Sequence, residues 1–141
     1  MPLILPPTTN TPLIRTDFSD DAAWSALLLA ITAPSPSDGF QANIDAIDDR
    51  AFADATPQAI TDGGSEQDAH AIAFIADRQT FASPERPVLC IDLLDPAHPA
   101  FRFIPAAAWS VENNLSLGNL DRSDFTNALD PDGIFRGFPG A

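Results

Sequence analysis

The chain of 141 residues contains no lysine, so all seven of its basic residues are arginines. Twenty acidic residues face them, and the formal net charge at pH 7 is −13. A field of this sign repels the phosphates of nucleic acids and of anionic membranes, so we expect neither as a partner. The same field attracts cations and basic protein surfaces. A large negative net charge also increases solubility without any binding function, so it does not by itself define a site.

Cysteine is nearly absent as well, since Cys90 is the single one and no disulfide can form within the chain. Long apolar runs are also lacking, and no segment approaches the roughly 20 apolar residues that a membrane span needs. The first seven residues, MPLILPP, have neither the basic region nor the apolar length of a signal peptide. These absences predict a soluble cytoplasmic protein.

The motifs of several enzyme classes are missing. The chain has no GxSxG elbow, no HExxH pair and no glycine-rich phosphate loop. His70 and His98 stand alone without paired cysteines, which argues against a zinc site. We therefore expect no cofactor, with one alternative considered below.

What the chain does contain is enough apolar sequence for one packed domain. Hydrophobic residues make up 45% of it, and its length matches one ordinary domain. The proline- and threonine-rich residues 1–11 predict an extended arm. We expect a single domain over residues 12–138 and a tail over residues 139–141.

Strands and helices alternate along this domain. Strands are predicted at residues 13–18, 42–47, 71–76, 88–94 and 101–104, with a last short one around Leu115 and Leu117. The apolar runs 71–76 and 88–94 are expected in the middle of the sheet, and 101–104 beside 88–94. A helix with Ser19 as its N-cap follows the first strand, and Asp121 opens a closing helix. This pattern predicts an α/β fold, a single three-layer domain with a mixed sheet of about five strands.

Acidic residues at the predicted strand ends suggest one chemistry. Carboxylates in such places hold Mg²⁺ or Ca²⁺ in several α/β folds. The candidate metal ligands are Asp17, Asp21, Asp48 and Asp92. The local interpretation is favoured, because a helix start explains Asp20 and Asp21 and a turn explains Asp48 and Asp49. The chain also lacks a lysine to neutralise a transferred phosphate.

A second group of polar residues lies inside apolar patterns and forms the candidate binding set. It consists of Arg15, Asp17, Glu112, Asn113, Asn114 and Arg136. The arginines either join carboxylates within the fold or anchor an anionic ligand. The glutamate and asparagines either satisfy buried backbone or contact a ligand.

Three segments carry a resemblance to a known family. They are LIRTDFSDDAAW at residues 13–24, WSVENNLSLGNLD at 109–121 with Phe125, and DGIFRGF at 132–138. The chain resembles a family of small bacterial and fungal proteins catalogued only as a domain of unknown function, over roughly residues 12–138. The resemblance implies one domain and brings no activity, cofactor or catalytic residue.

Two functions are compatible with these observations. The first is a non-enzymatic interaction protein that uses an acidic surface on a basic protein partner, in the manner of small immunity or inhibitor proteins. The alternative is a Mg²⁺- or Ca²⁺-dependent enzyme built on the aspartates at the strand ends. The sequence does not indicate an oligomeric state.

Overall fold

The computed structural model describes residues 3–35, 39–64, 70–95, 97–116, 118 and 120–138. It confirms the α/β class and a single domain, with six strands in one mixed sheet rather than five. The strands are β1 (Thr11–Arg15), β2 (Ile44–Ile47), β3 (Ile72–Ala76), β4 (Val88–Asp92), β5 (Phe101–Phe103) and β6 (Ile134–Phe135). The helices are α1 (Asp21–Thr32), α2 (Pro57–Gly63), α3 (Arg78–Ala82), α4 (Ala108–Ser116) and α5 (Arg122–Thr126), with short 3-10 turns at Arg50–Phe52 and Pro105–Ala107.

The strand order is β2-β1-β3-β4-β5-β6. β1 is parallel to both of its neighbours, β4 is antiparallel to β3 and β5, and β6 is parallel to β5. β1, β2, β3, β5 and β6 therefore end at one edge of the sheet, called here the carboxyl edge. β4 begins at that edge and ends at the opposite one, the amino edge. β3 and β4 lie in the middle, as their continuous apolar runs predict.

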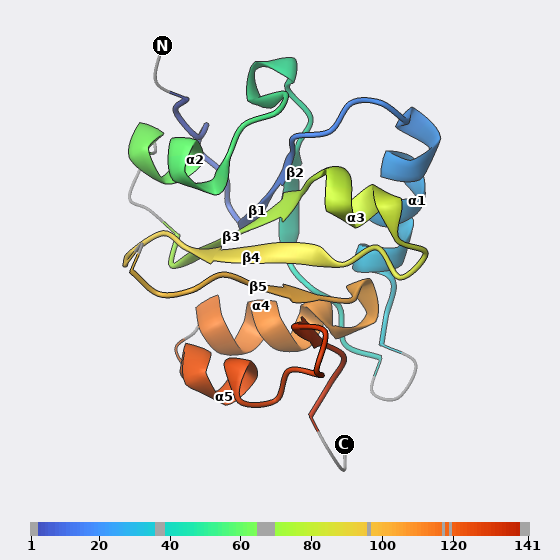
Figure 1. Ribbon diagram of the computed structural model, residues 1–141, viewed down its shortest axis with the longest axis vertical. Coiled ribbons are helices and arrows are strands. Elements are labelled where there is room, and N and C mark those ends of the chain that lie inside the picture. The colour runs from blue at the N-terminus through green and yellow to red at the C-terminus, as the bar shows by residue number, and fades with distance from the viewer. Residues whose placement is uncertain are drawn as a thin grey trace.

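Two apolar clusters cover the two faces of the sheet, and the alternation of side chains along each strand assigns residues to them. In β1, Leu13 belongs to the cluster that includes residues of α1, α4 and α5, and Ile14 belongs to the one that includes α2. In β3, Phe74 and Ile75 divide in the same way. In Figure 1, α2 and the pair α4 and α5 lie on opposite sides of β3 and β4. The three layers are thus helix, sheet and helix.

The N-terminal arm packs against the end of α2. The Leu5 amide donates to the Gly64 carbonyl at 2.9 Å, and Leu5 is buried. Gly63 faces the arm so closely that a Cβ there would overlap the Leu3 carbonyl oxygen. His70 holds the next part of the arm through the Thr8 hydroxyl and carbonyl.

Gly63→Ala is therefore expected to release the arm. Helix propensity alone predicts that alanine stabilises the helix by up to about 1 kcal/mol relative to glycine. We expect the opposite here, because the clash with the N-terminal arm lowers the free energy of unfolding. Hydrogen exchange of the Leu5 amide measures the release of the arm, and urea unfolding measures the change in the free energy of unfolding. A more stable variant with an equally protected Leu5 amide would contradict this packing.

The end of the chain departs from the sequence-based expectation in two places. Leu115 lies in α4 rather than in a strand, because Ala108, Val111 and Leu115 recur at helical spacing on a buried face. Leu117 lies outside the described residues. The sixth strand, Ile134–Phe135, has only two residues, too few to show an alternating pattern.

No helix within the described ranges is long and apolar enough to cross a membrane.

Candidate functional site

The acidic loops after β1 and β2 meet at the carboxyl edge because those two strands are parallel neighbours. Ile14 pairs with Ile47, so the residues that follow each strand emerge side by side. In the first loop the Asp20 carboxylate caps α1 by accepting the Ala23 amide at 3.0 Å, one residue later than the predicted Ser19. In the second, Asp49 accepts the Ala51 amide at 2.9 Å and starts the 3-10 turn.

The buried side chain of Arg15 connects the two loops. Its guanidinium donates to Asp21 at 2.7 Å and to Asp48 at 3.3 Å, and its Nε donates to the Asp17 carbonyl at 3.0 Å. The Arg15 side chain is 3% exposed, whereas Asp21 is 81% exposed and Asp48 51%. The hydrogen bond and charge of Arg15 hold the pKa of Asp21 below its usual range. Arg15 is thus a buried clamp, and the carboxylates that it orients still face water.

The result is a group of carboxylates at the ends of β1 and β2, called here the acidic surface. It consists of Asp17, Asp20, Asp21, Asp48, Asp49 and Asp54. Asp54 joins the others because its amide donates to the Thr16 carbonyl at 2.8 Å. Asp17 and Asp54 line a shallow hollow of about 540 Å³ beside it. Four of the six carry no ion pair to an arginine in the described part of the chain.

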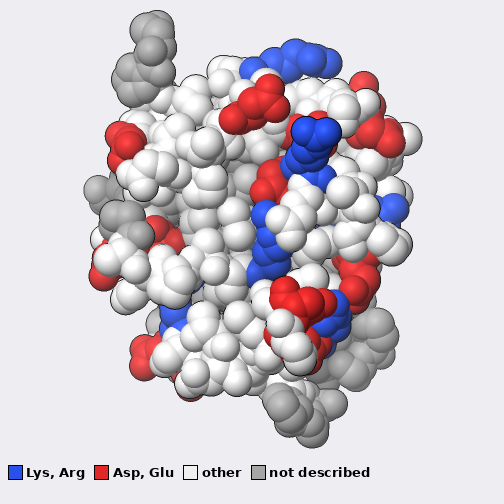
Figure 2. Space-filling model, in the orientation of Figure 1, with Lys and Arg blue, Asp and Glu red and all other residues white. Residues whose placement is uncertain are grey.

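Arginines crowd the same edge of the sheet. Six of the seven lie there: Arg15, Arg50, Arg78, Arg86, Arg102 and Arg136. Figure 2 shows basic side chains in a row down one face of the molecule, with acidic side chains near them. Arg102 binds Asp77 through two hydrogen bonds of 3.0 and 2.8 Å. Burial raises the pKa of Asp77, but the Arg102 hydrogen bond and charge, with Thr80, outweigh it and keep that pKa low.

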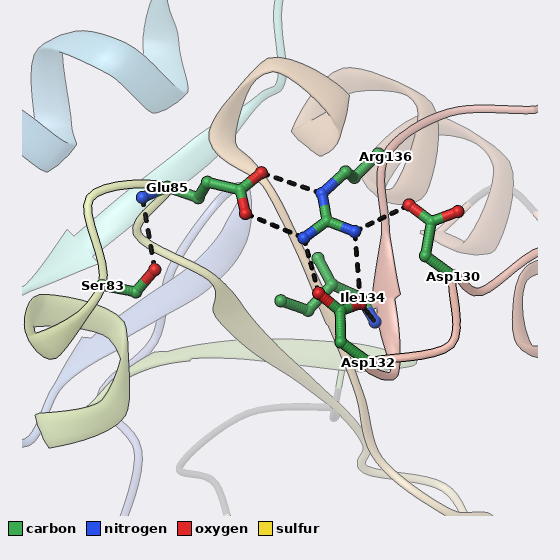
Figure 3. A network of polar contacts seen from close by, with 6 residues as sticks. All are labelled: Ser83, Glu85, Asp130, Asp132, Ile134 and Arg136. Atoms are coloured by element: carbon green, nitrogen blue, oxygen red, sulfur yellow. Dashed lines mark hydrogen bonds and ion pairs between the residues drawn. The ribbon is translucent and has the colours of Figure 1, made fainter.

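Arg136 is the most completely bound of these arginines (Figure 3). Glu85 accepts from its Nε and Nη2 at 2.8 Å each, and Asp130 and Asp132 accept from the remaining N–H groups at 2.7–3.2 Å. These contacts raise the pKa of Arg136 further above its ordinary value and lower that of Glu85. All five N–H groups are used, so none is left for an anionic ligand. Arg136 ties the segment around β6 to the loop before β4.

The other candidate binding residues point into α4 and its core. The Asn113 and Asn114 amides donate to the carbonyls of Trp109 and Ser110, one turn earlier, at 2.9 Å each. They therefore satisfy their own helix. Glu112 is 5% exposed, and its Oε2 has no hydrogen-bond partner in the described structure. Burial raises the pKa of Glu112, and the backbone amide of Asn43 offsets this only in part.

The four candidate metal ligands do not come together. Asp92 ends β4, which runs antiparallel, and pairs with Ile72 at the start of β3. It therefore lies at the amino edge, four residues along β3 from the end of that strand, which is about 13 Å at the usual rise. Asp92 is thus separated from the other three candidate ligands, and its place could not be foreseen because the direction of β4 cannot be read from its apolar run. Among the described residues no group of three His, Cys, Asp or Glu side chains is placed to hold a metal ion.

Asp92 instead binds His98, a contact that the sequence pattern does not mark. Its Oδ2 lies 2.7 Å from His98 Nδ1, and its Oδ1 accepts the amides of Leu94 and Asp95 at 2.8 and 2.9 Å. Burial raises the pKa of Asp92, but these three donors outweigh it and hold the pKa below its usual range. Five residues lie between Asp92 and His98 in the sequence, and the folded loop brings the two side chains into contact.

Comparison with known proteins gives one match. A family model described as a domain of unknown function, DUF6924, matches residues 10–138. No curated protein and no solved structure matches the chain.

Proposed function

The chain belongs to the DUF6924 family, a domain of unknown function, and from this premise we propose that it is a non-enzymatic binding protein whose acidic surface docks on a basic protein. One observation carries the proposal. Two loops that are far apart in sequence place six carboxylates at the same edge, and one buried arginine, Arg15, fixes the geometry of two of them, Asp21 and Asp48. Most of these carboxylates are exposed, so a partner reaches them without a change of fold.

The arrangement suits protein recognition because charge on a rigid edge steers a partner of opposite sign and fixes its register. Asp20 and Asp49 are held by the helix starts that they cap, and Asp21 and Asp48 by Arg15. Little side-chain freedom is therefore lost when a partner binds. Arginine and lysine side chains are the expected contacts on the partner.

The same geometry favours protein binding over a hard cation. Asp21 and Asp48 each direct an oxygen at Arg15, whose positive charge repels a metal ion. Millimolar Mg²⁺ or Ca²⁺ should therefore change the melting temperature no more than NaCl of equal ionic strength. A metal-specific increase that disappears in Asp17→Asn would contradict the proposal.

A capture experiment tests the proposal. The wild-type chain and a triple variant, Asp20→Asn/Asp49→Asn/Asp54→Asn, are immobilised and exposed to extract of the source cells. Asparagine caps helices as well as aspartate does, so the variant should keep its fold. We expect a basic protein to bind the wild type, to be released as salt rises, and to be lost from the variant.

A second triple variant controls for net charge. Asp62→Asn/Asp95→Asn/Asp124→Asn removes the same three charges from exposed positions outside the acidic surface. It should retain the partner. Equal loss from both variants would mean that the whole protein's charge, and not this surface, attracts the partner.

A further inference from the structure

A second pocket lies at the amino edge, away from the acidic surface. It measures about 510 Å³, within the range of small-molecule sites. The end of β4, the loop after it, the start of β3 and the helices α4 and α5 enclose it. Its apolar wall includes Ile72, Leu94, Leu115 and Leu120. Most of the exposed wall is apolar, and a few polar side chains converge on it, which is the usual character of a ligand site.

Arg122 supplies the positive charge of this pocket. Its Nη2 donates to the carbonyls of Cys90 at 3.4 Å and Pro99 at 2.9 Å, and its guanidinium lies 5.2 Å from the centre of the Phe101 ring. These contacts hold the group in place. Its Nε is buried and has no acceptor among the described residues.

Arg122 differs from the three other arginines that are shielded from solvent and form hydrogen bonds, Arg15, Arg102 and Arg136. Arg15, Arg102 and Arg136 each bind at least one carboxylate, whereas Arg122 binds only carbonyl oxygens and, at 3.8 Å, the Cys90 sulfur. In a chain with 20 acidic residues, the described structure gives this guanidinium no ion pair. The charge of Arg122 helps to lower the pKa of the nearby Asp92, but the two side chains form no ion pair. A positioned, partly buried cation that forms no ion pair is suited to an anion from outside.

Asp92, the less exposed of the two acidic residues that line the pocket, does not compete for this role. Three internal donors, His98 Nδ1 and the amides of Leu94 and Asp95, already cover the Asp92 carboxylate. Asp92 is therefore poorly available to a cationic ligand. His98 is held between Asp92 and Asp95, with its Nε2 3.6 Å from the Asp95 Oδ2. Asp121 also lines the pocket but is exposed to solvent at its rim.

We propose that this pocket binds a small organic acid, with the apolar body of the ligand against Leu115 and Leu120 and its carboxylate against Arg122. The apolar wall supplies most of the affinity, because binding removes its apolar surface and that of the ligand from water. Arg122 supplies selectivity for the acid over a neutral molecule of the same shape. This site lies outside the acidic surface and does not depend on protein binding.

Two matched probes test the proposal on the full chain. 3-Phenylpropionate and 3-phenylpropan-1-ol share an aromatic ring and a three-carbon chain and differ in the charged end. Each is titrated into ¹⁵N-labelled protein, and the amide signals are followed. We expect the acid to shift the amide signals of residues 94–95, 97–98 and 120–126, with an affinity about tenfold higher than that of the alcohol.

Arg122→Met should remove the preference for the acid while keeping the apolar length of the side chain. Arg78→Met is the matched control, because Arg78 is exposed at the opposite edge of the sheet. It should keep the tenfold preference. The comparison of the two probes on the wild type needs no variant, so it remains decisive if Arg122→Met does not fold.

The proposal is overturned by any of three results. The first is the absence of shifts in these residues with the acid at about 10 mM, which excludes even weak binding. The second is equal affinity for the acid and the alcohol. The third is an unchanged preference in a folded Arg122→Met variant.

Discussion

Arg15→Met is expected to lower the free energy of unfolding by about 3 kcal/mol, because it removes three hydrogen bonds from a charged group and an internal stacking contact. The guanidinium lies 4.5 Å from the Phe18 ring centre and 5.4 Å from that of Trp24. Methionine keeps part of this apolar contact. Asp21 and Asp48 remain in water, so the variant leaves no buried charge behind. Urea unfolding measures the effect as a lower midpoint with an unchanged m-value.

Arg50→Met is the matched control for this prediction. Arg50 also lies over the Phe18 ring, at 5.1 Å, but it is exposed and forms no ion pair within the described residues. Its replacement should change the free energy of unfolding by no more than about 0.5 kcal/mol. A loss of no more than about 0.5 kcal/mol for Arg15→Met as well would contradict the prediction and show that Arg15 stabilises the fold no more than a surface arginine does.

Glu112→Gln is expected to stabilise the protein at pH 8 by about 1–3 kcal/mol, the usual cost of a buried group without a partner. Burial raises the pKa of Glu112 in the folded protein, so folding favours its protonated form. At low pH the carboxyl is protonated in both states, and the penalty is absent. As pH rises from the ordinary glutamate pKa through the folded one, the unfolded state loses its proton first and folding is weakened. The advantage of glutamine should therefore appear as pH rises.

The measurement is the difference in free energy of unfolding between Glu112→Gln and the wild type, from pH 4 to pH 8. Taking the difference removes the contribution of the other acids, many of which have lowered pKa values and act in the opposite direction. A difference near zero at pH 4 that grows toward pH 8 is expected. A difference that stays constant across this range would show that the pKa of Glu112 is not higher in the folded protein than in the unfolded one.

The central part of the fold could be predicted from the sequence because it depends on local features, namely continuous apolar runs and helix caps. The apolar runs over residues 72–76 and 88–92 form the middle strands, since a short continuous apolar run is typical of a strand covered on both faces. The start of α1 was displaced by a single residue, because Ser19 and Asp20 are equally good caps. The strand expected around Leu115 was wrong because Leu115 shares helical spacing with Ala108 and Val111, and the alternation of two leucines is too short to outweigh that pattern.

The site was less accessible to sequence reasoning because it depends on strand order and direction. Asp21 and Asp48 meet at Arg15 because β1 and β2 are parallel neighbours. No local sequence pattern shows which strands are neighbours or in which direction they run. The antiparallel course of β4 sends Asp92 to the other edge for the same reason. The pocket around Arg122 is built from five separate segments, so its residues carry no shared motif.

The acidic surface as a docking site for a basic protein is the central claim, and the affinity of the captured partner tests it most directly. Its dissociation constant is measured for the wild type and for the two triple variants at one salt concentration. Asp20→Asn/Asp49→Asn/Asp54→Asn should bind at least about tenfold more weakly, while Asp62→Asn/Asp95→Asn/Asp124→Asn should stay within about twofold of the wild type. Equal affinities for the two variants would contradict the claim.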